Sequence, residues 1–104
     1  NPIMIGDQGV DQLYTFNDEV YTIVPNDDKK SFSVFKKKFS DNNKADENVK
    51  AGDLIPGSRS GSYILKMNDG LQASAYFDAN NNLVFDKLDS NGNMKTEMFR
   101  KVEN

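Results

Sequence analysis

The side chains of this chain that could do chemistry are carboxylates, lysines, tyrosines and two arginines, because histidine and cysteine are both absent. Without histidine and cysteine, the usual zinc sites and the serine–histidine and cysteine–histidine nucleophile systems are excluded. An enzyme built from the remaining residues would depend on carboxylates, lysine, tyrosine or a cofactor. The composition therefore favours a non-enzymatic binding protein that uses no cofactor and no metal ion.

Arg100 is the charged residue whose setting points most directly to ligand binding. In a strand expected at residues 94–102, alternation places it on one face with Met98 and Val102. A guanidinium on an apolar inward face is costly unless it is paired. Such a residue could hold the carboxylate of a fatty-acid-like ligand through two parallel hydrogen bonds. The structural alternative is that Arg100 reaches water at a barrel end or pairs with Asp86.

Small and flexible side chains suggest an interior that is not filled by bulk alone. Ala73 and Ala75 lie in the centre of an apolar face, Met98 is a flexible packing residue, and Tyr63 faces inward from a neighbouring strand. Together with Arg100, these are the predicted ligand-binding residues. A pocket explains the pattern. Plain packing explains it fully and is the preferred interpretation, because small barrels alternate small and large interior side chains.

Residues 78–82 (Asp-x-Asn-x-Asn), together with Asp86 and Asp89, have the oxygen spacing of a calcium-binding loop. However, Leu83 stands where the sharp turn of such a loop needs glycine, and Asp89 is shorter than the usual bidentate glutamate. Strands rather than helices are expected on both sides. We therefore interpret this segment as a polar hairpin turn.

Three consecutive lysines occupy residues 36–38, between Phe35 and Phe39. Alternation sends Lys37 to the side opposite its neighbours, so the lysines do not form one patch. The pattern is typical of an edge strand that lysines protect from aggregation. Attraction to an anionic polymer and stacking of a single-stranded nucleic acid are the alternatives. A net charge of −3 argues against a nucleic-acid partner.

The elements that must position these residues are short strands joined by turn signals. Pairs such as Asp69-Gly70 and Asn91-Gly92 supply the positive φ angles that tight hairpins need. Seven strand-like runs occur, at residues 13–17, 19–24, 31–39, 62–68, 71–77, 83–89 and 94–102. The sequence predicts an all-β fold, a single antiparallel up-and-down meander of about seven to eight short strands that forms a small barrel. With 104 residues, we expect one domain over residues 1–104.

Two segments interrupt this rhythm. Residues 1–12 are expected to be an irregular lead-in, and residues 40–61 a long loop, within which a helical turn at residues 45–51 and a short strand at residues 53–55 are possible. The loop ends in residues 56–61 (Pro-Gly-Ser-Arg-Ser-Gly), which have the flexibility of a binding loop. This segment is either a connector at the barrel rim or a loop that inserts into a partner's cleft.

Alternation also predicts which side chains face inward. The inward set is Tyr14, Phe16, Tyr21, Ile23, Tyr63, Leu65, Met67, Leu71, Ala73, Ala75, Phe77, Leu83, Phe85, Met94, Met98 and Val102. In the last run, Phe99 interrupts an outer face that carries Lys95 and Lys101. We therefore expect Leu65 and Met98 to be buried, and Lys95 and Lys101 to be exposed.

The last strand carries a family resemblance in the run Met98-Phe99-Arg100-Lys101-Val102. A meander that closes in this way resembles the calycins, which include lipocalins and fatty-acid-binding proteins and typically carry an arginine on the final strand. It also resembles the small lipocalin-like domains of bacterial surface lipoproteins. The resemblance covers residues 62–103 and implies a calycin-like barrel. The chain departs from it in having no tryptophan, since lipocalins typically carry Gly-x-Trp in the first strand.

These observations predict a non-enzymatic extracellular binding domain. Its partner is expected to be a small apolar or amphipathic ligand, or a cell-surface component such as a surface protein. The alternative is an inhibitor or adaptor that acts through residues 56–61. The absence of cysteine and histidine and the polar composition predict an exported, envelope-attached bacterial lipoprotein. Contact with a membrane is expected only through a leader or lipid anchor removed before Asn1, and the protein is expected to be a monomer.

Overall fold

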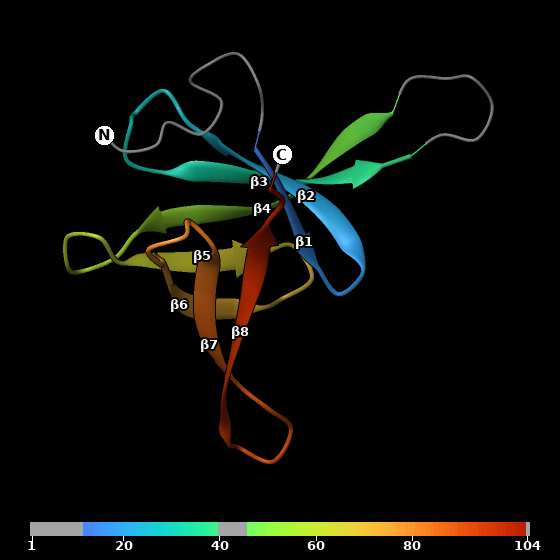
Figure 1. Ribbon diagram of the computed structural model, residues 1–104. Helices are drawn as coiled ribbons and strands as arrows, with labels where there is room; N and C mark the ends of the chain where they lie inside the picture. Colours follow the sequence, from blue (N-terminus) through green and yellow to red (C-terminus); the bar gives the residue numbers. More distant parts are fainter. Residues whose placement is uncertain (1–11, 40–45, 104) are drawn as a thin grey trace.

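The computed structural model describes residues 12–39 and 46–103, and these ranges contain eight strands and no helix (Figure 1). The strands are β1 (Leu13–Phe16), β2 (Glu19–Pro25), β3 (Phe32–Lys38), β4 (Glu47–Pro56), β5 (Tyr63–Met67), β6 (Gln72–Phe77), β7 (Leu83–Leu88) and β8 (Met94–Lys101). Each strand pairs antiparallel with the next, and β8 pairs with β1, so the sheet closes into a barrel. The predicted all-β meander and its closure into a small barrel are confirmed.

The loop expected at residues 40–61 is largely wrong, because β4 occupies most of its described part. β4 pairs with β3 from Lys38↔Glu47 to Phe32↔Leu54, so residues 47–51 form a ladder and not a helical turn. A β-bulge allows this pairing, since Val34 faces Gly52 while the next residue, Phe35, faces Lys50. Cross-strand pairing with β3 therefore decides the conformation of a segment whose own sequence is weakly strand-like. The lead-in at residues 1–11 and residues 40–45 lie outside the described residues.

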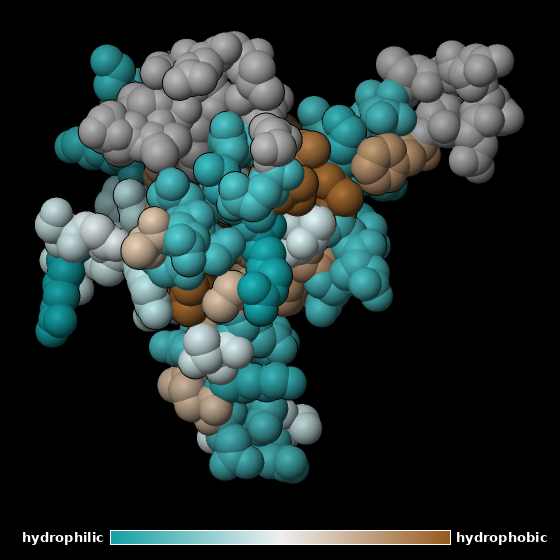
Figure 2. Space-filling model, viewed as in Figure 1, coloured by the Kyte–Doolittle hydropathy of each residue, from teal (hydrophilic) through white to brown (hydrophobic). Residues whose placement is uncertain are grey.

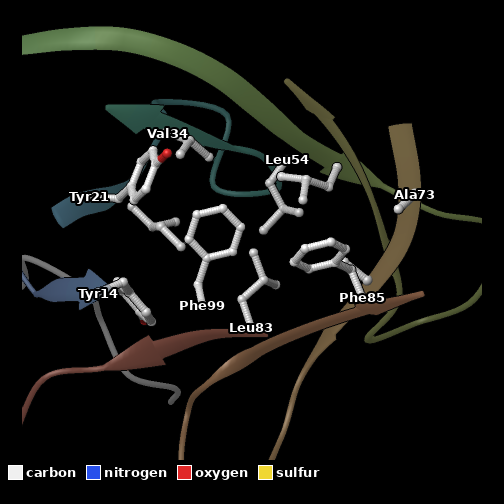
Figure 3. Close-up of a cluster of buried hydrophobic side chains, with 11 residues drawn as sticks. Tyr14, Tyr21, Val34, Leu54, Ala73, Leu83, Phe85 and Phe99 are labelled. Carbon is white, nitrogen blue, oxygen red and sulfur yellow. The ribbon is translucent and has the colours of Figure 1, made fainter. Parts of the chain in front are cut away.

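The interior contains the side chains that alternation predicts for β1, β2, β5, β6 and β7. In Figure 3, Tyr14, Tyr21, Leu83 and Phe85 converge from three strands on the barrel axis. The buried cluster consists of Tyr14, Tyr21, Ile23, Val34, Leu54, Leu65, Ala73, Ala75, Leu83, Phe85 and Phe99. Burial of this set stabilises the fold through the hydrophobic effect and close packing.

Two groups of aromatic rings fill the barrel along its length. Phe32, Tyr63 and Phe77 meet edge to face, with ring centroids 5.6–5.8 Å apart, beside the turns that join β2–β3, β4–β5 and β6–β7. The second group surrounds Phe99 and reaches Phe16, the last residue of β1, near the β1–β2 turn at the opposite strand ends. The described side chains therefore fill both the middle of the barrel and its ends.

The inward face expected for β8 is wrong. Phe99 is fully buried, whereas Arg100 is exposed and Met94 is 66% exposed. The register explains this, because Phe99 lies opposite the inward-facing Leu83 in β7. A phenyl ring gains from this site, and a guanidinium there would lose its hydration.

Of the four side chains whose exposure was predicted, two are as predicted and two are not. Leu65 is buried and Lys95 is exposed, as predicted. Met98 is only half-buried, because it lies on the outer face, and Lys101 is half-buried beside the barrel end. Both errors follow from the same reversal of the two faces of β8.

Two hairpins extend beyond the barrel wall (Figure 1). The β3–β4 hairpin does so because β2 pairs with β3 only as far as Lys36. The β7–β8 hairpin does so because β6 pairs with β7 only from Leu83 to Asp86. The strand ends of these hairpins are thus exposed on more than one side.

Candidate functional site

The structure divides the five predicted ligand-binding residues between two places. Ala73 and Ala75 are buried in the interior, and Tyr63 lies opposite Ala75 in the β5–β6 ladder, within the aromatic group at one barrel end. Arg100 and Met98 lie together on the outer face of β8. The five residues therefore do not form a single internal site around a buried arginine.

Arg100 and Met98 line an open groove of about 490 Å³ between β8 and the β1–β2 hairpin. The remaining lining residues are Thr15, Phe16, Asn17, Asp18, Glu19 and Val20. Arg100 forms no salt bridge with the residues that the structure describes, and its charge acts weakly on Asp78. The groove thus combines an exposed cation with methionine and valine side chains and with Asp18 and Glu19, and it is open to solvent.

The loop between β4 and β5 is closed by hydrogen bonds and has an exposed tip. The N–H of Gly57 donates to the carbonyl of Ser62 at 2.8 Å, and the N–H of Ser62 donates to the carbonyl of Arg59 at 3.0 Å. The Ser62 hydroxyl also donates to the Arg59 carbonyl at 2.8 Å. Ser58, Arg59 and Ser60 are exposed, and Gly61 has a φ of 83°, which glycine adopts at little cost. The segment is therefore a hydrogen-bonded turn that presents one guanidinium.

The segment with calcium-like spacing forms the β6–β7 turn. The Asp78 carboxylate accepts hydrogen bonds from the N–H groups of Asn80 at 2.8 Å and Asn82 at 2.9 Å. Both bonds lower the pKa of Asp78, and the bond from Asn82 has the larger effect. The carboxylate is thereby committed to its own turn. No group of three or more metal-binding side chains occurs in residues 12–39 or 46–103.

The lysine run does not lie on an edge strand throughout, because β3 pairs with both β2 and β4 as far as Lys36. Among the described strands, Lys37 and Lys38 pair with β4 alone. Lys36 forms a salt bridge of 3.1 Å with Glu19. The lysines thus protect the projecting end of a strand that is otherwise inside the barrel sheet.

Two buried hydroxyls are not evident from the sequence. The hydroxyl oxygens of Tyr14 and Thr22 are buried and have no hydrogen-bond partner among the described residues. Burial raises the pKa of Tyr14 to about 12, because the phenolate cannot be solvated there. Alternation places Tyr14 inward, but which buried hydroxyl lacks a partner depends on contacts across the barrel.

The face of the molecule seen in Figure 2 is mostly hydrophilic, with apolar residues visible in the body of the barrel and on the two projecting hairpins. The large apolar side chains that are exposed are Phe39, Val49, Tyr76, Leu88 and Met94. Leu88 and Met94 are cross-strand neighbours at the end of the β7–β8 hairpin. Exposed apolar side chains that adjoin on one surface are a feature of interaction sites.

Comparison of the chain with family models, with curated proteins and with solved structures gave no match. In the part of the chain that the structure describes, no helix is long and apolar enough to cross a membrane.

Proposed function

We propose that this protein is a non-enzymatic extracellular binding domain that contacts a partner protein through its outer surface. The contact is assigned to the β4–β5 loop, residues 57–62. The domain acts there as an adaptor or inhibitor. The observation that carries the proposal is the hydrogen-bonded, exposed Ser58–Arg59–Ser60 tip on a barrel whose interior is filled.

The interior offers little support for an enclosed ligand. An enclosed site for a drug-sized molecule needs roughly 300 Å³ or more of space among apolar walls. Ala73 lies opposite Leu65 and Ala75 lies opposite Phe85, and both of these larger side chains are fully buried. Arg100, which would have held a carboxylate, is on the outside. A ligand would therefore have to displace packed side chains.

The loop meets the physical requirements of a binding segment. Ser62 holds the Arg59 carbonyl from two of its own groups, so little conformational entropy remains to be lost when a partner binds. Arg59 forms no salt bridge with the described residues. A free guanidinium pairs best with a carboxylate, through two parallel hydrogen bonds. The expected partner is a protein with an acidic recess.

The experiment is site-specific photo-crosslinking of the intact protein on cells that produce it. A photoreactive residue at Ser60 is expected to give one discrete protein adduct, whereas the same residue at Asn80, in the β6–β7 turn, gives none. With the purified partner, Arg59→Glu should weaken binding at least about tenfold, because it places like charges together. Equal adducts from both positions, or equal affinity of wild type and Arg59→Glu, would refute the loop as the contact.

A second candidate function is favoured by the outer groove, which brings Arg100 and Met98 together. An amphipathic molecule could place its carboxylate at Arg100 and its chain against Met98 and Val20. Displacement of a fluorescent fatty acid, measured on wild type and Arg100→Ala, tests this candidate. Saturable binding that Arg100→Ala weakens would support the groove, and absence of saturable binding to wild type would eliminate it.

A further inference from the structure

β8 is paired along most of its length on one side and along only two residues on the other. On the first side, Met94 to Phe99 pair with β7. On the second side, β1 pairs only with Arg100 and Lys101. No described strand lies beside the segment from Met94 to Met98 on that side, so the barrel has an open edge at this point.

The main chain of this segment directs hydrogen-bonding groups to the open side. The N–H of Val102 donates to the carbonyl of Leu13, the first residue of β1, at 2.8 Å. Because main-chain groups alternate between the two sides of a strand, those of Met94, Thr96 and Met98 point to the same side as those of Val102. They lie beyond the end of β1 and form a template for another strand.

The side chains along this edge alternate strictly between uncharged and charged residues. Met94, Thr96 and Met98 lie on the outer face, where the Thr96 hydroxyl donates to Asp86 at 2.6 Å. Lys95 and Glu97 lie on the other face. The Lys95 side chain is 61% exposed, and its ammonium nitrogen lies 3.6 Å from the Glu97 carboxylate. One cation and one anion therefore flank Thr96 symmetrically.

We propose that a second copy of this chain pairs with this edge, antiparallel, across a two-fold axis that passes beside Thr96. In this arrangement Thr96 lies opposite Thr96 of the second copy, and Met94 lies opposite Met98. Lys95 lies opposite Glu97 of the second copy, and this pair occurs twice. Opposite charges and Thr–Thr pairs directly across an antiparallel ladder are stabilising.

The charges select this register over its neighbours. A hydrogen-bonded register can shift only in steps that keep Met94, Thr96 and Met98 facing the open side. The adjacent shift in one direction places Lys95 opposite Lys95, and the shift in the other direction places Glu97 opposite Glu97. Both contacts are repulsive. The edge is thus self-complementary in one register, as an isologous two-fold interface requires.

The surroundings of the edge are compatible with a second copy. The β7–β8 hairpin projects from the barrel, so its end is approachable (Figure 1). Within one copy, Lys87 and Lys95 are directly opposite each other, and the Glu97 carboxylate lies 3.2 Å from Lys87 and 3.6 Å from Lys95; a second copy would place another carboxylate on the open side of Lys95. The turn of the second copy at residues 89–93 would arrive beside the β1–β2 turn and must bend away from β1, which already pairs with Arg100. The proposal departs from the expected monomer and is independent of the proposed function.

Sedimentation velocity over a concentration series, at low ionic strength, tests the proposal. We expect wild type to shift from monomer to dimer as its concentration rises, and added salt to weaken the dimer by screening. Lys95→Glu and Glu97→Lys should each weaken the dimer at least about tenfold, because each variant faces only like charges in its own homodimer. An equimolar mixture of the two variants should restore the dimer. In the mixed pair, the carboxylates at positions 95 and 97 of Lys95→Glu face the ammonium groups at positions 97 and 95 of Glu97→Lys.

The mixture is the decisive measurement, because two variants that failed to fold could not form a dimer with each other. Lys30→Glu, in the β2–β3 turn, changes the net charge by the same amount as Lys95→Glu and should leave the dimer unchanged. A wild type that remains monomeric at sub-millimolar concentration would overturn the proposal. Single variants that dimerise like wild type, or a mixture that stays monomeric, would overturn it as well.

Discussion

The ring of Phe99 lies 4.7 Å from the ring of Phe16, centroid to centroid, so the last strand and the first strand meet inside the barrel. Tyr21 and Phe85 also contact Phe99, at 5.0 and 5.7 Å. We expect Phe99→Ala to lower the free energy of unfolding by about 3–5 kcal/mol, since it leaves a cavity among the surrounding rings. Denaturant titration followed by circular dichroism measures this change.

Arg100→Ala is the matched control, because it truncates the adjacent residue on the other face of β8. Its effect on the free energy of unfolding should be within about 0.5 kcal/mol, as is usual for exposed positions. A larger loss for Arg100→Ala than for Phe99→Ala would mean that the two faces of β8 are exchanged in solution.

Tyr14 should make the protein less stable at alkaline pH. The unfolded chain releases this proton near pH 10, and the folded protein only near pH 12. Between these values the unfolded state therefore binds fewer protons, and the free energy of unfolding falls by about 1.4 kcal/mol per pH unit. Below the unfolded pKa this contribution is constant. Denaturant titrations between about pH 8 and about pH 12 measure the slope.

Tyr14→Phe isolates this effect, because burial also raises the pKa of Tyr21. The variant should have a shallower alkaline slope than wild type. At neutral pH it should be as stable as wild type or about 1 kcal/mol more stable, since it removes a buried hydroxyl that has no partner. Tyr76→Phe, at an exposed site, should retain the wild-type slope. An unchanged slope in Tyr14→Phe would show that its hydroxyl is solvated.

Gly52 is required by a close approach between β4 and β5. A Cβ at this position would lie 2.6 Å from the Lys66 carbonyl oxygen and 2.9 Å from the Met67 Cα. Because these are backbone atoms, they cannot move without distorting the sheet. We expect Gly52→Ala to lower the free energy of unfolding by roughly 2 kcal/mol or more, a loss typical of overpacking. Thermal unfolding followed by circular dichroism reports this loss.

Gly61→Ala separates steric overlap from backbone strain. Gly61 has a φ of 83°, but a Cβ there would meet no atom within 4 Å. Its replacement should cost only about 1 kcal/mol, from the left-handed conformation alone. If Gly52→Ala proved no worse than Gly61→Ala, the two strands would have to be farther apart than the structure indicates.

Three turn carboxylates should make the protein less stable in acid. Backbone N–H donors lower the pKa of Asp28, Asp78 and Asp89 below the ordinary value of 3.8. The stability that these bonds provide is present above pH 3.8 and is lost as the pH falls through the lowered values. Carbon-detected NMR titration of the carboxyl groups should give pKa values below 3.8 for all three. The N–H group that lowers the pKa most is that of Lys30 for Asp28, that of Asn82 for Asp78 and that of Asn93 for Asp89.

A variant with all three residues changed to asparagine should lose less stability than wild type when the pH falls below 3.8. Asp27→Asn, in the same turn as Asp28, controls for the removal of one negative charge. Identical acid dependence in wild type and in the triple variant would mean that these bonds do not form in solution.

Turn chemistry made most of the barrel predictable. Asp69-Gly70 and Asn91-Gly92 mark reversals, and Gly70 and Gly92 have φ angles of 107° and 83°. The last four strands begin and end within one residue of the predicted runs. Residues 53–55 of β4 were predicted as a possible strand. Residues 47–51 were missed because they lack an apolar alternation, and their conformation depends on pairing with β3, which local sequence does not report.

The candidate site was less predictable than the fold. In β8 and just after it, Met94, Met98 and Val102 outnumber Phe99, so alternation alone favours the wrong face. The true face is set by the register with β7, where one buried ring at Phe99 outweighs the exposed methionines. The prediction that Arg100 faces inward was wrong for the same reason. The open edge of β8 was equally hidden, because it depends on where β1 ends.

Closure of the barrel by only Tyr14↔Lys101 and Thr15↔Arg100 has a consequence for the order of folding. Every other junction joins strands that are consecutive in the chain, so each hairpin can nucleate locally and quickly. The β1–β8 junction instead requires closure of a loop that includes all the other strands, which has the largest entropic cost. It should form last and separate first. Each such separation would briefly lengthen the free edge of β8 towards Lys101.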